Sequence, residues 1–220
     1  MSALQGFELY RFYHAGDDET AALRGVDVRL DPGELVALVG PSGSGKSTLL
    51  TCLAGLDEPD GGHVEIMGQR LSRRPEATRA RLRARHIGIL MQSGNLFDHL
   101  TVASNIALQI SLSGKRNRGS LLERLGIGEV ADALPSQLSG GEAARAGLAV
   151  ALAADPEILI CDEPTAEVDA ETERRILEFL DERRRRGCAV LVATHSASLA
   201  QQADRVLHIS DGRIVPRIVP

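Results

Sequence analysis

A run of nine residues, from position 40 to position 48, combines glycines, hydroxyl groups and a lysine in a spacing that suits phosphate. The run reads Gly40, Pro41, Ser42, Gly43, Ser44, Gly45, Lys46, Ser47 and Thr48. Its glycines let the backbone curl so that successive N–H groups point into one concavity. This is the spacing of a P-loop, in which Lys46 would reach the outer phosphates and the Ser47 hydroxyl would ligate Mg2+. The run therefore predicts a site for a nucleoside triphosphate.

The segments on either side of this run are those that a P-loop needs. The apolar residues 35–39 predict a buried strand before the loop, and residues 48–54 predict a helix after it. A helix that begins here would add the positive end of its dipole to the anion site. The plainer interpretation, a glycine-rich turn before a helix, is disfavoured because eight positions and both flanks fit.

Two adjacent carboxylates stand at the end of another predicted buried strand, over residues 158–161. In open α/β sheets, ligands bind at the carboxyl ends of the strands. Asp162 is placed to hold Mg2+, directly or through water. Glu163, one residue further, can orient an attacking water. Taken alone, adjacent acids could simply end a strand, but beside a P-loop they indicate hydrolysis.

Residues 138–142 predict a second helix N-terminus that could bind an anion. Ser139 is suited to cap this helix, and Gly140 and Gly141 open it, followed by Glu142. One chain needs only one such cradle for one triphosphate, so a second cradle suggests a second anion or a role in a neighbouring copy. A well-capped helix would give the same pattern, and the residues alone do not decide between these interpretations.

Taken in order along the chain, these segments resemble those of ATP-binding-cassette (ABC) ATPases. The matching positions are 40–48, Gln92, 138–142, 158–163, Asp169 and His195. The resemblance covers nearly the whole chain, and Leu-Ser-Gly-Gly between a P-loop and a strand that ends in Asp-Glu is specific to the family. Residues 87–92 and 135–137, among others, are similar to the branch of lipoprotein-releasing, macrolide-efflux and cell-division ATPases (LolD, MacB and FtsE types).

The resemblance implies further contacts to a bound ATP. Tyr13 would stack on adenine, with Phe12 or Tyr10 in its place if the alignment is shifted. Gln92 would sense Mg2+ and the attacking water, and His195 would contact the γ-phosphate. Without the resemblance, a packed strand aromatic, a surface glutamine and a structural histidine would be the default interpretations. The catalytic residues that we expect are Lys46, Glu163 and His195.

The resemblance also implies that the site is shared between two copies. Ser139 and Gly141, in the segment with Gly140 and Glu142, would touch the γ-phosphate bound to the opposite subunit. Asp169 would organise the dimer interface near the site. The expected ligands are ATP and Mg2+, and the expected partners are a second copy of the chain, or a paralogous cassette, and integral membrane permease subunits.

The chain departs from the commoner family pattern at a few positions. Glu142 stands where glutamine is frequent, Ser196 stands where aspartate usually follows the histidine, and Val150 replaces a common arginine. Residues 166–169 also differ from the usual small-Ala-Leu-Asp. These differences affect the expected interface and docking surface more than the expected catalysis.

Strands that alternate with helices predict an α/β fold: a P-loop NTPase core with a mostly parallel sheet, a small antiparallel β subdomain and an inserted helical subdomain. We expect a single domain over residues 1–220. Its core would comprise residues 1–91 and 138–220, and the helical insert would span about 92–137, where strand signals disappear.

Local predictions follow from the same pattern. Short strands are expected over residues 7–13 and 26–30, separated by a polar turn over 16–19. Within the insert, helices are expected over 102–112, 121–125 and 130–134, with a mobile link over 113–119. The arginines between positions 70 and 85, and those at 183–186, are expected to form solvated helix faces or ends, rather than sites for lipid or phosphate.

The composition narrows the class of protein. The chain has 220 residues, of which 43% are hydrophobic and 25% charged, and its formal net charge of -5 argues against a nucleic-acid partner. No apolar run approaches the ~18 residues of a membrane-spanning helix, and the N-terminus does not resemble a secretion signal. Three cysteines, far apart and without a Cys-x-x-Cys pair, predict buried reduced thiols.

The hypothesis is an ATPase subunit that dimerises around two ATP molecules and drives a membrane permease, for export, lipid or lipoprotein extraction, or force transmission. It would be cytoplasmic and peripheral on the inner face of the cell membrane. The alternatives are a soluble ABC ATPase in a non-transport assembly and a small-molecule P-loop kinase. The Leu-Ser-Gly-Gly stretch counts against the kinase.

Overall fold

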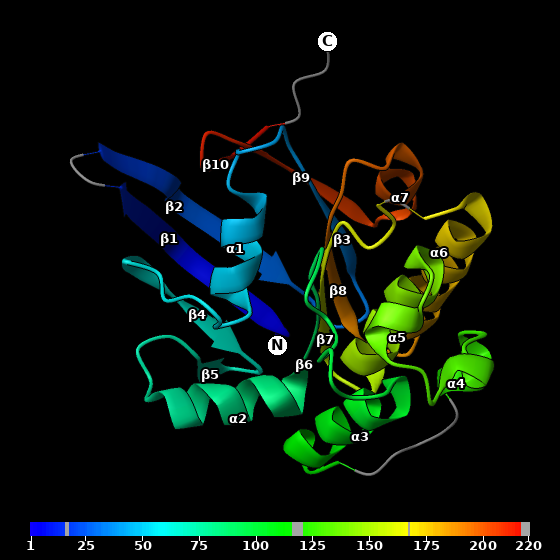
Figure 1. The fold of residues 1–220 in the computed structure, drawn as a ribbon. Coiled ribbons are helices and arrows are strands. Elements are labelled where there is room, and N and C mark those ends of the chain that lie inside the picture. Colours follow the sequence, from blue (N-terminus) through cyan, green and yellow to red (C-terminus); the bar gives the residue numbers. More distant parts are fainter. Residues whose placement is uncertain (16–17, 116–120, 167, 217–220) are drawn as a thin grey trace.

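A six-stranded sheet with five neighbouring parallel strands forms the centre of the molecule (Figure 1). The computed structural model describes residues 1–15, 18–115, 121–166 and 168–216. In spatial order the strands are β10 (Arg213–Val215), β9 (Arg205–Ser210), β3 (Leu35–Val39), β8 (Ala189–Ala193), β7 (Ile158–Asp162) and β6 (Ile87–Leu90). The short β10 runs antiparallel to β9. The sheet confirms the predicted α/β core.

A second, antiparallel sheet lies beside the first and confirms the predicted antiparallel part of the fold. Its order is β2 (Asp18–Leu30), β1 (Leu4–Ala15), β4 (Gly61–Ile66) and β5 (Gln69–Arg70). Because β1 and β2 have 12 and 13 residues, the expectation of short strands is wrong. Register shifts along β1 break the alternation of side chains, which hides its full length in the sequence. The expected turn at 16–19 falls partly outside the described residues, and residues 18 and 19 belong to β2.

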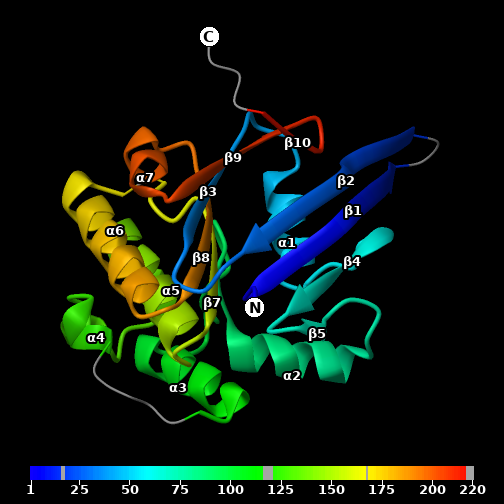
Figure 2. The same cartoon turned by 180° about the vertical axis from the view of Figure 1, so that it is seen from behind.

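Helix α1 (Lys46–Leu53) packs between the two sheets (Figures 1 and 2). Its apolar side, which includes Leu49 and Leu50, is fully buried in a cluster with residues from both sheets. Strand β3 turns alternate side chains toward α1, among them Val36 and Leu38, and the remaining ones toward the opposite face. The loop that joins β3 to α1 is therefore held between two buried elements.

Three helices cover the opposite face of the six-stranded sheet: α5 (Gly140–Leu152), α6 (Ala170–Arg185) and α7 (Ala197–Gln202). The sheet is thus buried on both faces, which explains the continuous apolar runs of its central strands. Gly187, which follows α6, has a φ of 93°, a backbone conformation that glycine adopts without strain.

The described residues between 92 and 137 contain helices and no strand. They form α3 (Val102–Ser113), α4 (Leu121–Arg124) and two 3-10 turns, η1 (Gly128–Val130) and η2 (Pro135–Gln137). The helix expected over 130–134 is wrong. Leu134 precedes a proline and is extended, with a ψ of 154°, because the proline ring disfavours a helical conformation there. The link at 113–119 lies partly outside the described residues, and the division into core and insert stays a prediction.

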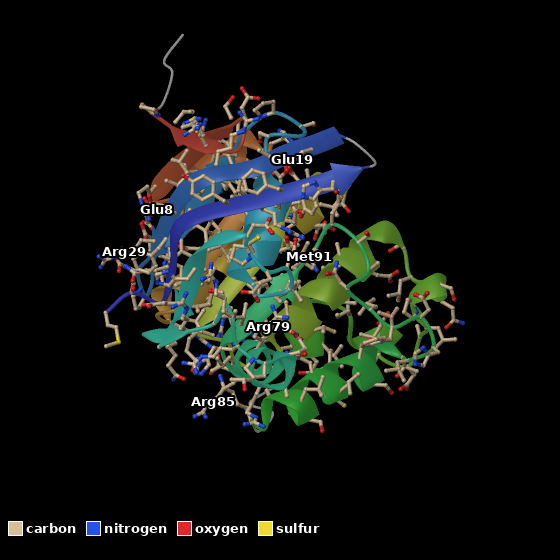
Figure 3. The ribbon with its side chains drawn as sticks, turned by 90° about the vertical axis from the view of Figure 1, so that its left-hand side faces the viewer. Glu8, Glu19, Arg29, Arg79, Arg85 and Met91 are labelled. Carbon is tan, nitrogen blue, oxygen red and sulfur yellow. The ribbon has the colours of Figure 1, made fainter. Side chains whose placement is uncertain are left out.

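Helix α2 (Glu76–His86) carries the first arginine cluster, and its arginines are only partly solvated. Figure 3 shows Arg85 at the outer edge of the molecule and Arg79 closer to its body. Arg79 forms ion pairs with Glu58 and Glu76, and its side chain is 18% exposed. Arg79 therefore ties this helix to the turn that follows α1, whereas Arg81 and Arg85 are exposed, as expected for a solvated face.

The second arginine cluster, at the end of α6, divides in the same way. Arg185 and Arg186 are largely exposed, as expected for a solvated helix end. Arg183 instead pairs with Asp155 and Arg184 with Asp204, and these two ion pairs fasten α6 to the rest of the fold. Arg184 also pairs with Asp181 within α6. None of the described helices is long and apolar enough to cross a membrane. The three cysteines are buried and unpaired, as predicted.

Candidate active site

Four loops that follow four neighbouring parallel strands meet at one edge of the six-stranded sheet. The P-loop, residues 40–45, follows β3, His195 follows β8, Glu163 follows β7 and Gln92 follows β6. Parallel strands end at the same edge of a sheet, so the topology alone brings these loops together. The order β3-β8-β7-β6 thus assembles segments that are up to 155 residues apart, from position 40 to position 195.

Two glycines of the P-loop have no room for a side chain. A Cβ at Gly45, where φ is 104°, would lie 2.5 Å from the carbonyl oxygen of Ala22, and one at Gly40 would lie 2.2 Å from that of Ile209. Gly43, with a φ of 76°, faces open space, so there the backbone conformation alone favours glycine. The loop is pressed against β2 and β9 at its ends and is open in its middle.

Polar groups inside the P-loop remain available to an anion. Lys46 is 7% exposed, and its Nζ donates hydrogen bonds to the carbonyl oxygens of Gly40 (2.8 Å) and Pro41 (3.1 Å). The ammonium group has three donors, so one is left for a ligand. The buried Ser44 hydroxyl makes no hydrogen bond with the described residues, and no side chain caps the start of α1. These donors surround the position where a phosphate would lie.

Two clefts open beside the P-loop, and Lys46 and Ser47 line both of them. The larger cleft, of about 500 Å³, contains the predicted residues on the far side of the loop: Gln92, Asp162, Glu163 and His195. The smaller cleft, of about 340 Å³, contains Tyr13 and Thr48. The remaining P-loop residues that line one or both clefts are Ser42, Gly43 and Gly45. Neither Tyr10 nor Phe12 lines either cleft, so the geometry favours Tyr13 as the aromatic contact.

The carboxylate of Glu163 lies against His195. The His195 backbone N–H donates to Glu163 Oε2 (3.2 Å), and His195 Nε2 lies 3.4 Å from Oε1. The Glu163 backbone has a φ of 49° and donates its own N–H to the carbonyl oxygen of Ala193. Oε1 is buried and accepts no hydrogen bond from the described residues. Glu163 lines the larger cleft, and a carboxylate beside a phosphate site can hold and orient a water molecule.

The side chains that the sequence predicts for Mg2+ share the larger cleft. Ser47, Gln92 and Asp162 all line it, and Asp162 is 4% exposed. Oxygen donors with few carboxylates suit Mg2+, which keeps several waters and phosphate oxygens as ligands. No group of three or more His, Cys, Asp or Glu side chains among the described residues could hold a metal. The donor set therefore fits an ion that is shared with a phosphate, not one enclosed by protein alone.

Tyr13 is held in place by a charged cluster on the adjoining turn. Its hydroxyl donates to Asp57 Oδ2 (3.0 Å), and the Arg11 guanidinium lies 4.7 Å from the centre of its ring. Arg11 also donates two hydrogen bonds to Asp57. Burial alone would raise the pKa of Asp57, but the hydrogen bonds from Arg11 and Tyr13 outweigh it and hold the pKa below its ordinary value. The ring is thus oriented before any ligand arrives.

Residues 139–142, which were predicted to contact the nucleotide of the opposite subunit, line neither cleft. Ser139 caps α5, and Glu142 reaches back so that its Oε2 accepts from the Ser139 hydroxyl (2.6 Å) and backbone N–H (2.8 Å). These hydrogen bonds lower the pKa of Glu142. Asp169 also lies outside the clefts and caps α6, where the backbone N–H and hydroxyl of Thr172 lower its pKa. One chain therefore does not bring these residues to its own P-loop.

Some cleft residues were not predicted from the sequence. Arg24 and the turn Asp211–Gly212 line the smaller cleft, and Thr165 and Ser196 line the larger one. The Gly212 N–H donates to the carbonyl oxygen of Ser44, so this turn also supports the P-loop. The Asp-Gly pair was a turn signal after a parallel strand and could have indicated its position. An arginine within a strand, such as Arg24, carries no such signal.

The model of the ABC transporter family matches residues 23–166, more than half of the chain. The chain belongs to the ABC transporter family. The match confirms the resemblance that the P-loop, the Leu-Ser-Gly-Gly stretch and the Asp-Glu pair indicated. That the clefts beside the P-loop are the nucleotide site stays a prediction.

Individual relatives confirm the branch in part. The lipoprotein-releasing system ATP-binding protein LolD of Hyphomonas neptunium is 40% identical over 212 residues, which cover 93% of each chain. The macrolide export ATP-binding/permease protein MacB of Syntrophobacter fumaroxidans is 36% identical over 225 residues, which cover 98% of this chain and 32% of MacB. The expected similarity to FtsE types stays a prediction.

A solved structure supports the fold and the activity. The dimeric, post-hydrolysis ATP-binding cassette MJ0796, bound to ADP and Pi, has a TM-score of 0.91 and 29% sequence identity, with 97% of each chain covered. Together with the family match, this makes the chain an ATP-binding subunit of an ABC transporter and an ATPase.

Proposed function

We propose that two copies of this chain enclose two ATP molecules between them and that their closure drives a membrane permease. The division of the predicted ligands within one chain carries this proposal. Lys46, Glu163 and His195 line the clefts beside the P-loop, whereas the 139–142 segment and Asp169 lie outside them. A second copy, or a paralogous cassette, with its 139–142 segment over the P-loop would complete each site. The dimeric state of MJ0796 supports this arrangement.

Within the site, each catalytic residue has a task that its position allows. Lys46 directs its remaining N–H donor to the outer phosphate oxygens. Ser47 and Asp162 would hold Mg2+, and the ion would supply positive charge beside the phosphates. Glu163 orients the attacking water through its carboxylate. His195, which lies against Glu163, contacts the γ-phosphate and stabilises the charge that develops on it.

The remaining residues bind the rest of the nucleotide or connect the two copies. Tyr13 stacks on the adenine, supported by Arg11 and Asp57. Gln92 links the Mg2+ site to the residues that follow it. From the opposite copy, Ser139 and Gly141 contact the γ-phosphate, and Asp169 lies at the interface.

The Glu163→Gln variant tests the shared site. It keeps the shape of the side chain but removes the charge that orients water, so ATP should bind without being hydrolysed and the closed dimer should accumulate. Light scattering after size exclusion, with saturating ATP and Mg2+, should show a dimer that disappears when ADP replaces ATP. Adding Lys46→Ala to this variant should abolish the dimer. A Glu163→Gln protein that stays monomeric at saturating ATP contradicts the proposal.

A groove beside the nucleotide site offers a surface for the permease. It has a volume of about 480 Å³ and lies between α2 and α3, with Leu112 and Val150 among its apolar lining. Ile87 and Ile89 of β6 form part of its wall, and the same strand leads to Gln92 in the larger cleft. A permease segment in this groove would therefore lie one strand away from the ATP. With a permease bound there, the protein would be cytoplasmic and peripheral on the inner face of the membrane. We expect no nucleic-acid partner.

Co-purification from membranes tests the permease. The wild-type protein should recover an integral membrane partner, and Leu112→Asp together with Val150→Asp should lose that partner while keeping ATP affinity. Recovery of intact protein with no membrane partner would instead favour the non-transport assembly.

A further inference from the structure

His195 is fixed to the fold through its neighbours in the chain more than through its own side chain, which is 56% exposed. The Thr194 side chain before it is fully buried, and the Ser196 backbone N–H donates to the Thr194 hydroxyl (2.9 Å). Ser196 is also the N-cap of α7 and accepts a hydrogen bond from the Leu199 N–H. The position of the imidazole therefore depends on how the start of α7 is held.

The start of α7 is held by a single carboxylate oxygen on α6. Glu173 Oε1 accepts a hydrogen bond from the Ser196 hydroxyl (3.0 Å) and another from the Ser198 hydroxyl (2.8 Å). The two hydroxyl oxygens also lie 2.7 Å apart, so the three side chains form one compact cluster in which the two hydroxyl protons serve two hydrogen bonds at a time. Glu173 belongs to the first turn of α6, directly after the Asp169 cap, and its own N–H donates to the Asp169 carbonyl oxygen.

We propose that Glu173 is a positioning residue for His195, acting through Ser196 and Ser198. The inference rests on the proposed catalytic role of His195 and adds a residue that does not line the nucleotide clefts. Two constraints then act on the His195 loop from opposite sides. Glu163 holds the His195 backbone N–H, and Glu173 holds the residue that follows. Removal of Glu173 leaves the first constraint and frees the second.

The geometry also ties two elements of the proposed dimer together. Asp169 caps the same helix turn that carries Glu173, and Arg145 of α5 donates to the Thr172 hydroxyl in this turn (2.8 Å). The start of α6 therefore contacts the loop of His195 through Glu173 and the helix of the 139–142 segment through Thr172. A shift of α6 on dimer closure would move the His195 loop with it.

The test measures hydrolysis and ATP binding separately in the Glu173→Ala variant of the full chain. The rate constant kcat should fall about tenfold or more, because sub-ångström displacement of a catalytic group has effects of that size. The ATP dissociation constant should stay within about twofold of the wild type, because Glu173 lines neither cleft and, within the described part of the chain, its side chain hydrogen-bonds to Ser196 as the one cleft residue. Glu173→Gln, whose carbonyl oxygen can accept both hydroxyl hydrogen bonds, should restore most of the rate.

Controls separate positioning from a general loss of structure. Glu178→Ala removes another carboxylate of α6, one that pairs with Arg174 of the same helix, and should leave kcat unchanged. Glu173→Ala and Ser198→Ala should be non-additive in kcat, since both disrupt the same hydrogen-bonded cluster. The inference is overturned if Glu173→Ala hydrolyses ATP at the wild-type rate, if it loses ATP affinity in proportion to rate, or if Glu173→Gln is as slow as Glu173→Ala.

The failure of this inference can be told apart from the failure of the proposed function. If His195→Ala loses activity and Glu173→Ala does not, the positioning role alone is wrong. If His195→Ala hydrolyses ATP at the wild-type rate, the proposed catalytic role of His195 is wrong, and the role of Glu173 is overturned with it.

Discussion

The chain contains two glycine-containing helix starts that could bind phosphate, and they differ in what occupies them. At α1, no side chain caps the helix and no acidic residue lies in the first turn, so the donors remain free. At α5, Ser139 caps the helix and Glu142 reaches back to Ser139 with its carboxylate. An anion at α5 must therefore compete with a negative charge that is already there. This difference explains how one helix start could bind ATP alone while the other contributes only when a partner delivers the nucleotide.

The glycines at the two helix starts also differ in how they are packed. Gly40 and Gly45 are pressed against backbone carbonyl oxygens of β9 and β2. A Cβ at Gly140 would meet nothing within 4 Å, and one at Gly141 would meet only side-chain ends at 3.2 Å or more. The glycines of the P-loop are needed by the fold of one chain, whereas that at position 140 leaves an open surface. Such a surface suits close approach by a second molecule.

The largest effect is expected at the P-loop. Gly45→Ala would force a Cβ against the Ala22 carbonyl oxygen at a φ of 104°. We expect a loss of at least ~2 kcal/mol in the free energy of unfolding, together with loss of ATP binding. Chemical denaturation and titration calorimetry measure the two. The Cβ of Gly43→Ala would meet open space, so this variant should lose only about 1 kcal/mol in the free energy of unfolding. Equal losses of unfolding free energy in Gly43→Ala and Gly45→Ala would contradict the packing argument.

At the α5 helix start, the corresponding substitution should spare the single chain. Gly140→Ala lies in a helix with open space, so it should stabilise the fold by about 0.5–1 kcal/mol. The monomer should bind ATP as the wild type does. In the Glu163→Gln background, however, its methyl group should weaken the ATP-dependent dimer by about tenfold or more, which analytical ultracentrifugation can measure. An unchanged dimer would show that this surface does not face the partner.

The difference between the helix starts of α1 and α5 also shows which features of the molecule the sequence could predict and which it could not. The P-loop, the strand before Asp162 and the alternation of strands with helices follow from local patterns, namely apolar runs, turns and glycine spacing. Strands β1 and β2 were predicted too short because register shifts break the periodicity on which the prediction depends. The expected helix over 130–134 failed because Pro135 acts on the conformation of the residue before it.

Within the site, local patterns indicated which residues have chemical roles but not how they are supported. The Glu173 carboxylate beside Ser196 comes from a different helix, 23 residues away in sequence. The arginines at 183 and 184 were expected to be solvated, and this expectation is wrong. Their carboxylate partners at 155 and 204 are brought near them only by the fold, so the local sequence does not indicate these ion pairs. Hydrogen bonds between distant segments are set by tertiary packing, for which a single sequence has no periodic signal.

The smallest effect, and the one expected to be a gain, concerns the charge at the α5 helix start. Glu142→Gln keeps the length and the backward hydrogen bond to the Ser139 N–H but removes the negative charge beside the Ser139 hydroxyl. In the Glu163→Gln background, the ATP-dependent dimer should become several-fold tighter, because the partner's phosphate no longer approaches a carboxylate.

The pKa of Glu142 is below its ordinary value, and a lowered pKa keeps the group charged at every pH above it. The gain should therefore be the same at about pH 6 and about pH 8. Gains that differ between these two values would mean that another group is responsible, and no gain at either would show that the Glu142 carboxylate does not compete with the partner's nucleotide.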